Sequence, residues 1–153
     1  MTAELTIYVD ADACPVKTEV VKVAERHQLR VVLVANSWMQ APRGQRIRMQ
    51  VVPGSFDAAD DWIVEHVAQD DIVVTSDIPL ASRCLHAGAR ILAPSGKEFS
   101  NDNIGNALAT RELMADLRAY GVGGGPPPFG PKDRSRFLEQ LELVVREATR
   151  NRG

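Results

Sequence analysis

The sequence predicts an α/β protein with a doubly wound, mainly parallel sheet of about five strands. Short apolar runs rich in β-branched residues alternate, over about residues 1–95, with segments whose apolar residues recur at helical spacing. Such alternation is typical of βαβ units, in which helices cover both faces of a parallel sheet. A chain of 153 residues with 44% hydrophobic composition is long enough for one domain with one core.

Apolar spacing and turn residues give the order of elements in the first half of the chain. They predict a strand at 5–9, a helix at 15–27, strands at 30–35 and 49–52, and a helix at 57–67. Pro15 favours a helix start because proline fits the first helical turn, and Pro53-Gly54 ends the third strand. Asp57 is placed to cap the next helix. The stretch at 37–48 is irregular.

The second half completes the sheet and adds further helices. The predicted elements are a strand at 72–75, a helix at 80–87, a strand at 89–92 and helices at 103–120 and 133–150. Gly88 ends the first of these helices, and the second is compatible with a break near Thr110. The Gly/Pro-rich run at 121–131 is expected to be a connector. We therefore expect a single domain over 1–153, with a helical elaboration over about 100–150 that covers the sheet or a dimer partner.

Composition limits the classes of partner and the cellular location. The formal net charge of −2 gives no overall attraction to nucleic acid, so a local basic patch or a bound metal ion has to hold a polyanion. No apolar run approaches the ~20 residues that span a bilayer, and the N-terminus does not resemble a secretion signal. We expect a cytoplasmic protein without a membrane partner. Cys14 and Cys84 are expected to be buried thiols rather than a disulfide.

Aspartates follow the predicted strands, where ligands bind in parallel α/β sheets. Asp10 ends the first strand and Asp12 follows on the turn, whereas Asp77 comes after IVVT and Asp60 lies one turn into the helix at 57–67. Like charges at one edge repel, so a hard cation is their expected partner. Mg²⁺ or Mn²⁺ suits oxygen ligands and serves phosphodiester hydrolysis. These four aspartates are the predicted metal-binding and catalytic residues.

Residues near these aspartates have supporting or purely structural interpretations. Asp57 is more simply a helix cap than a site residue, although it can support the site, and Asp61 is expected to be solvated. Thr75 and Ser76 precede Asp77, so one of their hydroxyl groups can support the metal site.

Basic and aromatic residues provide candidates for nucleic-acid binding. Arg43, Arg46 and Arg48 are predicted in a loop around Gly44, where they can bind phosphates, and solvated arginines are an equally good interpretation. Lys17, one helical turn after Cys14, can also meet a phosphate. For Trp38, core or dimer packing is favoured over stacking on a base. None of the three histidines, His27, His66 and His86, is assigned to metal.

Four sequence motifs carry a resemblance to a known family. VDADACPVK at 9–17, FDAAD at 56–60, VTSDIPLA at 74–81 and a GGP followed by a DR…F helix resemble the YaiI/YqxD family of bacterial proteins. The resemblance covers nearly the whole chain and implies a PIN-like nuclease fold, in which acidic residues at the ends of parallel strands hold Mg²⁺ or Mn²⁺. By motif, these acidic residues are Asp10, Asp12, Asp60 and Asp77. The chain is short where many PIN-like nucleases carry further acids.

Three functions remain open at this point. The first is a metal-dependent nuclease that hydrolyses phosphodiester bonds, with RNA as the expected substrate. The second is a PIN-like domain that binds RNA or protein without cleavage. The third is a haloacid-dehalogenase-type phosphatase in which Asp10 attacks phosphate and Asp12 is the acid-base, but Ala13-Cys14 replaces the glycine and hydroxyl residue expected there.

Overall fold

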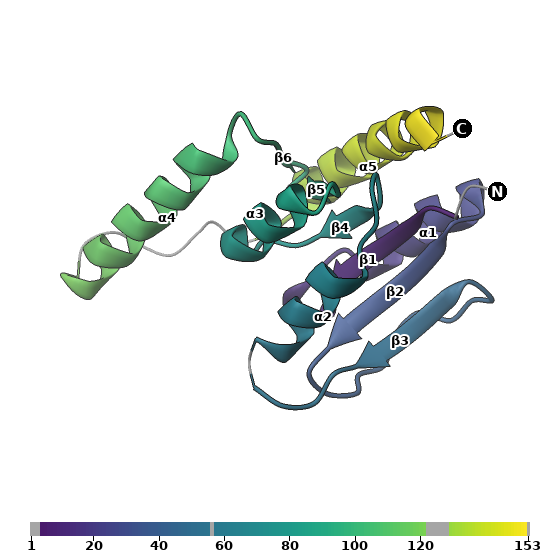
Figure 1. The fold of residues 1–153 in the computed structure, drawn as a ribbon, viewed down its shortest axis with the longest axis horizontal. Coiled ribbons are helices and arrows are strands. Elements are labelled where there is room, and N and C mark those ends of the chain that lie inside the picture. The colour runs from purple at the N-terminus through teal and green to yellow at the C-terminus, as the bar shows by residue number, and fades with distance from the viewer. Residues whose placement is uncertain (1–3, 56, 122–128, 153) are drawn as a thin grey trace.

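The computed structural model describes residues 4–55, 57–121 and 129–152. Within these residues a six-stranded sheet lies between two layers of helices (Figure 1). The strands are β1 (Thr6–Asp10), β2 (Arg30–Ala35), β3 (Ile47–Val51), β4 (Ile72–Val74), β5 (Arg90–Leu92) and β6 (Glu98–Phe99). Their order is β3-β2-β1-β4-β5-β6, and only β6 runs antiparallel to its neighbour. The predicted α/β fold class is confirmed.

Helices follow most of the strands, as expected for a parallel sheet. They are α1 (Lys17–His27), α2 (Ala58–His66), α3 (Ile78–His86), α4 (Ile104–Ala119) and α5 (Pro131–Arg152), and a 3₁₀ turn, η1 (Ala11–Ala13), joins β1 to α1. None of the helices in the described residues is both long and apolar enough to cross a membrane.

Alternate residues of each strand enter two separate cores. Ile7 and Val9 of β1 pack toward α1 and α5, whereas Tyr8 packs on the opposite face with α2 and α3. Phe137 and Leu141 of α5 are fully buried on the first face. The last helix therefore covers the sheet, which was one of the two alternatives expected for it.

The strand order reverses between β1 and β4, and this reversal positions the site. β2 and β3 extend from one side of β1, and β4 and β5 extend from the other. The helices that follow β1 and β4 therefore leave the sheet on opposite faces, which opens a crevice at the carboxyl ends of these two strands. Asp10 is the last residue of β1, so its carboxylate lies at this crevice.

Several local predictions need correction. The third strand begins at Ile47, two residues earlier than predicted, so Arg48 lies in β3 and not in a loop. β3 is an edge strand beside β2, and its partly exposed residues lack the apolar alternation from which a strand start is predicted. α4 is continuous through Thr110. The two-residue strand β6 was not predicted, since it is too short to show a period. Phe56 and the 122–128 part of the Gly/Pro run lie outside the described residues.

Candidate metal centre

A hydroxyl group joins two of the predicted aspartates at the carboxyl edge of the sheet. Thr75 Oγ1 donates to Asp10 Oδ2 at 2.9 Å and accepts from the backbone N–H of Asp77 at 3.0 Å. Asp77 Oδ1 in turn accepts from the backbone N–H of Leu80, so Asp77 also caps α3. Thr75 is buried, whereas Ser76 is exposed. Of the two predicted hydroxyl groups, Thr75 is therefore the one that orients the acidic residues.

Asp60 faces these two aspartates from α2. Burial raises its pKa to about 6, and the charges of Asp10, Asp77 and Asp57 raise it in the same direction. The charge of Arg83 lowers this pKa, but by less than the carboxylates raise it, and its guanidinium also forms an ion pair with Asp61 at 2.9 Å. Three segments of the chain thus bring carboxylates within electrostatic range of one another, as the sequence predicted.

Asp10 lies at the centre of this group of carboxylates. Burial raises its pKa, the hydrogen bond from Thr75 lowers it, and the charges of Asp77 and Asp12 raise it again. Asp12 lies on the β2 side of the edge, where its Oδ2 accepts from the backbone N–H of Asn36 at 3.1 Å. Asp12 therefore flanks Asp10 on one side, and Asp60 and Asp77 flank it on the other.

Asp57 is the residue before α2, as predicted, but its side chain makes no capping hydrogen bond. Its carboxylate lines a pocket of about 380 Å³ together with Asp60 and Asp77. Asp61 lines the same pocket, and its side chain is 52% exposed, in agreement with its predicted solvation. The structure therefore favours the supporting interpretation of Asp57 over the capping interpretation.

The chemical type of the donors fits a hard divalent cation. The carboxylates are oxygen donors, and Mg²⁺ is typically held by one or two carboxylates plus water. In the part of the chain that the structure describes, however, no group of three or more His, Cys, Asp or Glu side chains is arranged so that it could hold a metal ion. Water or a substrate oxygen would therefore have to supply the remaining ligands.

Comparison with known proteins identifies the family. Residues 8–147 match the family model described as "Uncharacterized BCR, YaiI/YqxD family". The chain belongs to this family. The match includes all four predicted metal-binding aspartates, so the motif resemblance is confirmed.

Relatives of this YaiI/YqxD chain cover almost its full length. A UPF0178 protein of Azorhizobium caulinodans is 56% identical over 142 residues, covering 92% of this chain and 89% of the relative. One of Rhodopseudomonas palustris is 54% identical over 155 residues, covering 100% of this chain and 98% of the relative. One of Brucella ovis is 57% identical over 143 residues, covering 92% and 89%. No solved structure matches the chain, and the PIN-like assignment stays a prediction.

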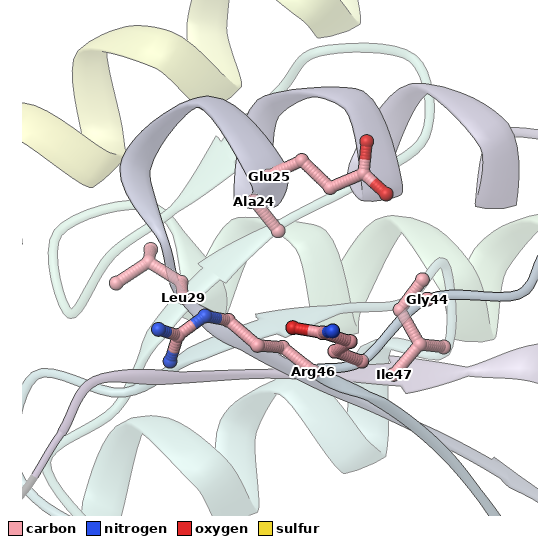
Figure 2. Close-up of a pocket in the computed structure, with 7 residues that line it drawn as sticks. Ala24, Glu25, Leu29, Gly44, Arg46 and Ile47 are labelled. Carbon is pink, nitrogen blue, oxygen red and sulfur yellow. The ribbon is translucent and has the colours of Figure 1, made fainter.

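The structure does not bring Arg46 or Arg48 to the acidic edge, and Arg43 lines a separate pocket beside Trp38 and Met49. Arg46 precedes β3 and pairs with Glu4 at 2.8 Å, at the amino ends of the strands. The length of β3 separates this end from the carboxyl edge by roughly 16 Å. Figure 2 shows Arg46 in a hollow beside Glu25 and Leu29, near the end of α1. Arg48 bonds to Gln50 within β3.

Two other candidates lie nearer the acidic edge. Lys17 begins α1 and donates to the carbonyl oxygen of Cys14 at 2.8 Å. Trp38, three residues after β2, is 73% exposed, so the prediction that it packs in the core is wrong. Exposure of this ring leaves dimer packing and base stacking as its open interpretations.

The cysteines and histidines have structural surroundings. Cys14 and Cys84 are buried free thiols, as predicted, and burial raises the pKa of each. His27 contacts Glu142 at 2.6 Å, while His66 and His86 contact the backbone carbonyl groups of Trp62 and Ser82 respectively. That none of these histidines binds metal stays a prediction.

Sequence reasoning missed two cationic residues at the site. Arg83 of α3 and Arg111 of α4 line the same pocket as Asp60 and Asp77. Arg83 has a sequence signal, because it lies one to two turns into the helix that Asp77 caps. Arg111 has none, since it is far from every acidic motif in sequence and only the packing of α4 beside α3 brings it there (Figure 1).

Proposed function

We propose that this YaiI/YqxD chain is a metal-dependent nuclease with a PIN-like fold that hydrolyses phosphodiester bonds, with RNA as its substrate. The observation that carries the proposal is the gathering of carboxylates at the carboxyl edge of the sheet, where Thr75 joins Asp10 to Asp77. Asp60 lines one pocket with Asp77, and its raised pKa has three other carboxylates as its largest causes after burial. Such crowding is costly in the protein alone and is relieved by a bound cation. It occurs at the switch point of the sheet, where ligands of α/β proteins bind.

The residues of the proposed site would have different roles. Asp10, Asp12, Asp60 and Asp77 would hold Mg²⁺ or Mn²⁺. When bound, the ion supplies a clamp for a phosphate oxygen, an activated water and charge stabilisation for the leaving oxygen. Thr75 fixes the carboxylate of Asp10 through its hydrogen bond, and the start of α3 holds Asp77.

The first experiment is a thermal melt in EDTA, Mg²⁺ and Mn²⁺. Saturating metal should raise the melting temperature by several degrees, because a ligand that binds only the folded state stabilises it. Asp10→Asn and Asp77→Asn should lose this shift, and Asn keeps the capping capacity of Asp77. In EDTA, Asp10→Asn should melt above the wild type, because a charge is removed from a repelling group. Glu65→Gln, on α2 but outside the acidic pocket, is the matched control, and its metal shift should persist.

Cleavage assays then separate the enzyme from its alternatives. A labelled single-stranded RNA should be cut in Mn²⁺ by the wild type and survive with Asp10→Asn. If the protein binds the RNA and leaves it intact, the nuclease proposal is wrong and the protein is a binding protein that does not cleave. If a phosphorylated Asp10 is trapped during turnover of a phosphate monoester, the protein is a phosphatase of the haloacid-dehalogenase type instead. An absence of any metal shift at millimolar concentration, with RNA present, would contradict the metal site itself.

A further inference from the structure

A second and larger groove adjoins the acidic pocket. Its volume is about 660 Å³, and it begins at Ser76 and Ile78, on either side of Asp77. The turn between β5 and β6 forms one wall, and α4 forms the other. Because β4 and β5 are parallel neighbours, this groove continues the carboxyl edge of the sheet beyond the acidic pocket.

The charge of this groove is opposite to that of its neighbour. Three cationic side chains line it, those of Lys97, Arg111 and Arg118, and its lining includes no acidic side chain among the residues that the structure describes. The chain as a whole has a formal net charge of −2, so this local excess of positive charge is not a reflection of composition. It provides the local basic patch that a polyanion needs on an acidic protein.

Arg111 lies at the junction of the two cavities, because it lines both. Arg118 follows seven residues later, on the same face of α4 and about 10 Å further along its axis. Neither guanidinium forms an ion pair with any residue of 4–55, 57–121 or 129–152, although other exposed arginines of the chain do. Both arginines are therefore available to an external anion.

The opposite wall is held in place by the fold. The backbone N–H of Gly96 donates to Ala93 at 2.9 Å, and that of Ala93 donates to Lys97 at 2.8 Å, which closes the turn. Gly96 has a φ of +92°, and a Cβ there would meet Arg136 at 2.7 Å, so the turn packs directly on α5. The ammonium group of Lys97 lies 5.7 Å from the ring centre of Phe99.

Uncharged side chains complete the groove between these cations. Ile78, Phe99 and Met114 contribute apolar surface, and the exposed side chains of Asn106 and Thr110 contribute hydrogen-bonding groups. A ligand that carries regularly spaced negative charges with apolar and hydrogen-bonding groups between them matches this lining. Single-stranded nucleic acid has this character, and positive grooves that follow the backbone are typical of proteins that bind it.

We infer that this groove binds the backbone of single-stranded nucleic acid, with Arg111 contacting the phosphate nearest the acidic pocket and Lys97 and Arg118 contacting phosphates beyond it. The inference rests on the proposed function, because the acidic pocket would then act on the strand that the groove holds. A strand can enter between the two walls, whereas a duplex presents its phosphates on a rigid, convex surface. Single strands are therefore the preferred class of substrate.

The test is fluorescence anisotropy of a labelled single-stranded RNA, measured in EDTA over a series of salt concentrations. The combined variant Lys97→Ala, Arg111→Ala and Arg118→Ala should bind at least about tenfold more weakly at 0.1 M salt. The dependence of log K on log salt should become shallower by about 0.7 for each lost phosphate contact. The matched control combines Arg43→Ala, Arg46→Ala and Arg48→Ala, which removes the same charge beside β3 and should leave binding almost unchanged.

Separate readouts distinguish failure of this inference from failure of the proposed function. A weakened control with an unaffected groove variant would overturn the inference while leaving the metal site standing. The melting temperature in EDTA shows that each variant folds. The shift of melting temperature by Mg²⁺ should persist in both variants, because none of the four aspartates is changed. If no metal shift exists in any protein, the proposed function fails, and RNA affinity in EDTA still decides the inference. Equal binding of a duplex with the same sequence would overturn the preference for single strands.

Discussion

The two edges of the sheet treat their acidic residues in opposite ways. At the amino edge, the buried carboxylate of Asp71 accepts hydrogen bonds from the backbone N–H groups of Thr6, at 3.0 Å, and Ala68, at 2.9 Å. It also forms an ion pair with Arg152. Glu4 at the same edge pairs with two arginines. At the carboxyl edge, the neighbours of Asp60 are mainly other carboxylates.

The causes of the pKa shifts express the same difference. Burial raises the pKa of Asp71, but its next three causes, the N–H groups of Ala68 and Thr6 and the charge of Arg152, all oppose the shift. Burial also raises the pKa of Asp60, and its next three causes are carboxylates that add to the shift. The described residues therefore compensate the charge of Asp71 internally, whereas the carboxylates around Asp60 add to its shift. In the proposed function, a bound cation compensates these carboxylates. This contrast distinguishes structural aspartates from candidate ligands more clearly than burial does.

Replacement of Asp71 should have the largest effect on stability among the changes predicted for the two edges. Asp71→Ala leaves two backbone N–H groups without their acceptor, so it should lower the free energy of unfolding by about 2–4 kcal/mol. Denaturant unfolding measures this change. Exposed Asp61→Ala is the control and should stay within about 0.5 kcal/mol of the wild type. A loss below about 1 kcal/mol for Asp71→Ala would show that the amino edge does not depend on internal compensation.

A smaller effect is expected from pH at the carboxyl edge, because Asp60 is partly exposed and water screens its neighbours. The folded pKa of Asp60, about 6, exceeds the unfolded value of ~3.9, so the folded state binds the proton more tightly. Stability of the metal-free protein should therefore fall as pH rises from about 4 to 6 and then level off. Melts in EDTA at several pH values measure this fall, and Asp60→Asn should reduce it.

The matched control for this pH prediction is Glu65→Gln, which removes a charge from the exposed side of α2 outside the acidic pocket. It should keep the pH dependence of the wild type, because Glu65 is not among the groups that shift the pKa of Asp60. Mg²⁺ should abolish most of the dependence in the wild type by compensating the ionised carboxylates. Identical pH profiles for Asp60→Asn and the wild type would mean that the carboxylates do not interact as the geometry indicates.

The smallest effect should come from the exposed pairs of the amino edge. Arg46→Ala removes an ion pair with Glu4, and both side chains of the pair are exposed. The free energy of unfolding should therefore change by less than about 1 kcal/mol. Thermal melts at low and high salt measure it, and high salt should reduce the difference between variant and wild type. A larger loss of stability that does not depend on salt would show that Arg46 stabilises the amino edge in addition to the buried Asp71.

The acidic site was largely predictable because its residues follow strands directly. Asp10 and Asp77 come at the ends of apolar runs, and the carboxyl ends of parallel strands meet at one edge whatever the loops do. Asp60 was predictable from its place in the first turn of a helix. Arg48 was placed wrongly in a loop, because the start of an edge strand has only a weak apolar pattern. Arg46 does precede β3, as predicted, but its position in the sequence does not say which edge of the sheet it reaches. For Trp38 the core alternative was wrong, because aromatic character alone does not report burial, and dimer packing stays a prediction.

The sequence by itself determined the α/β class, the order of its elements, the family and the aspartates of the candidate site. These depend on local signals: apolar period, turn residues and motifs of a few residues. Only the tertiary structure decided which charges meet, namely that Arg46 lies at the far edge and that Arg111 joins Asp77 across the packing of α4 on α3. The physical reason is that charge compensation depends on distances between segments far apart in the chain, and those distances are fixed by packing rather than by any local pattern.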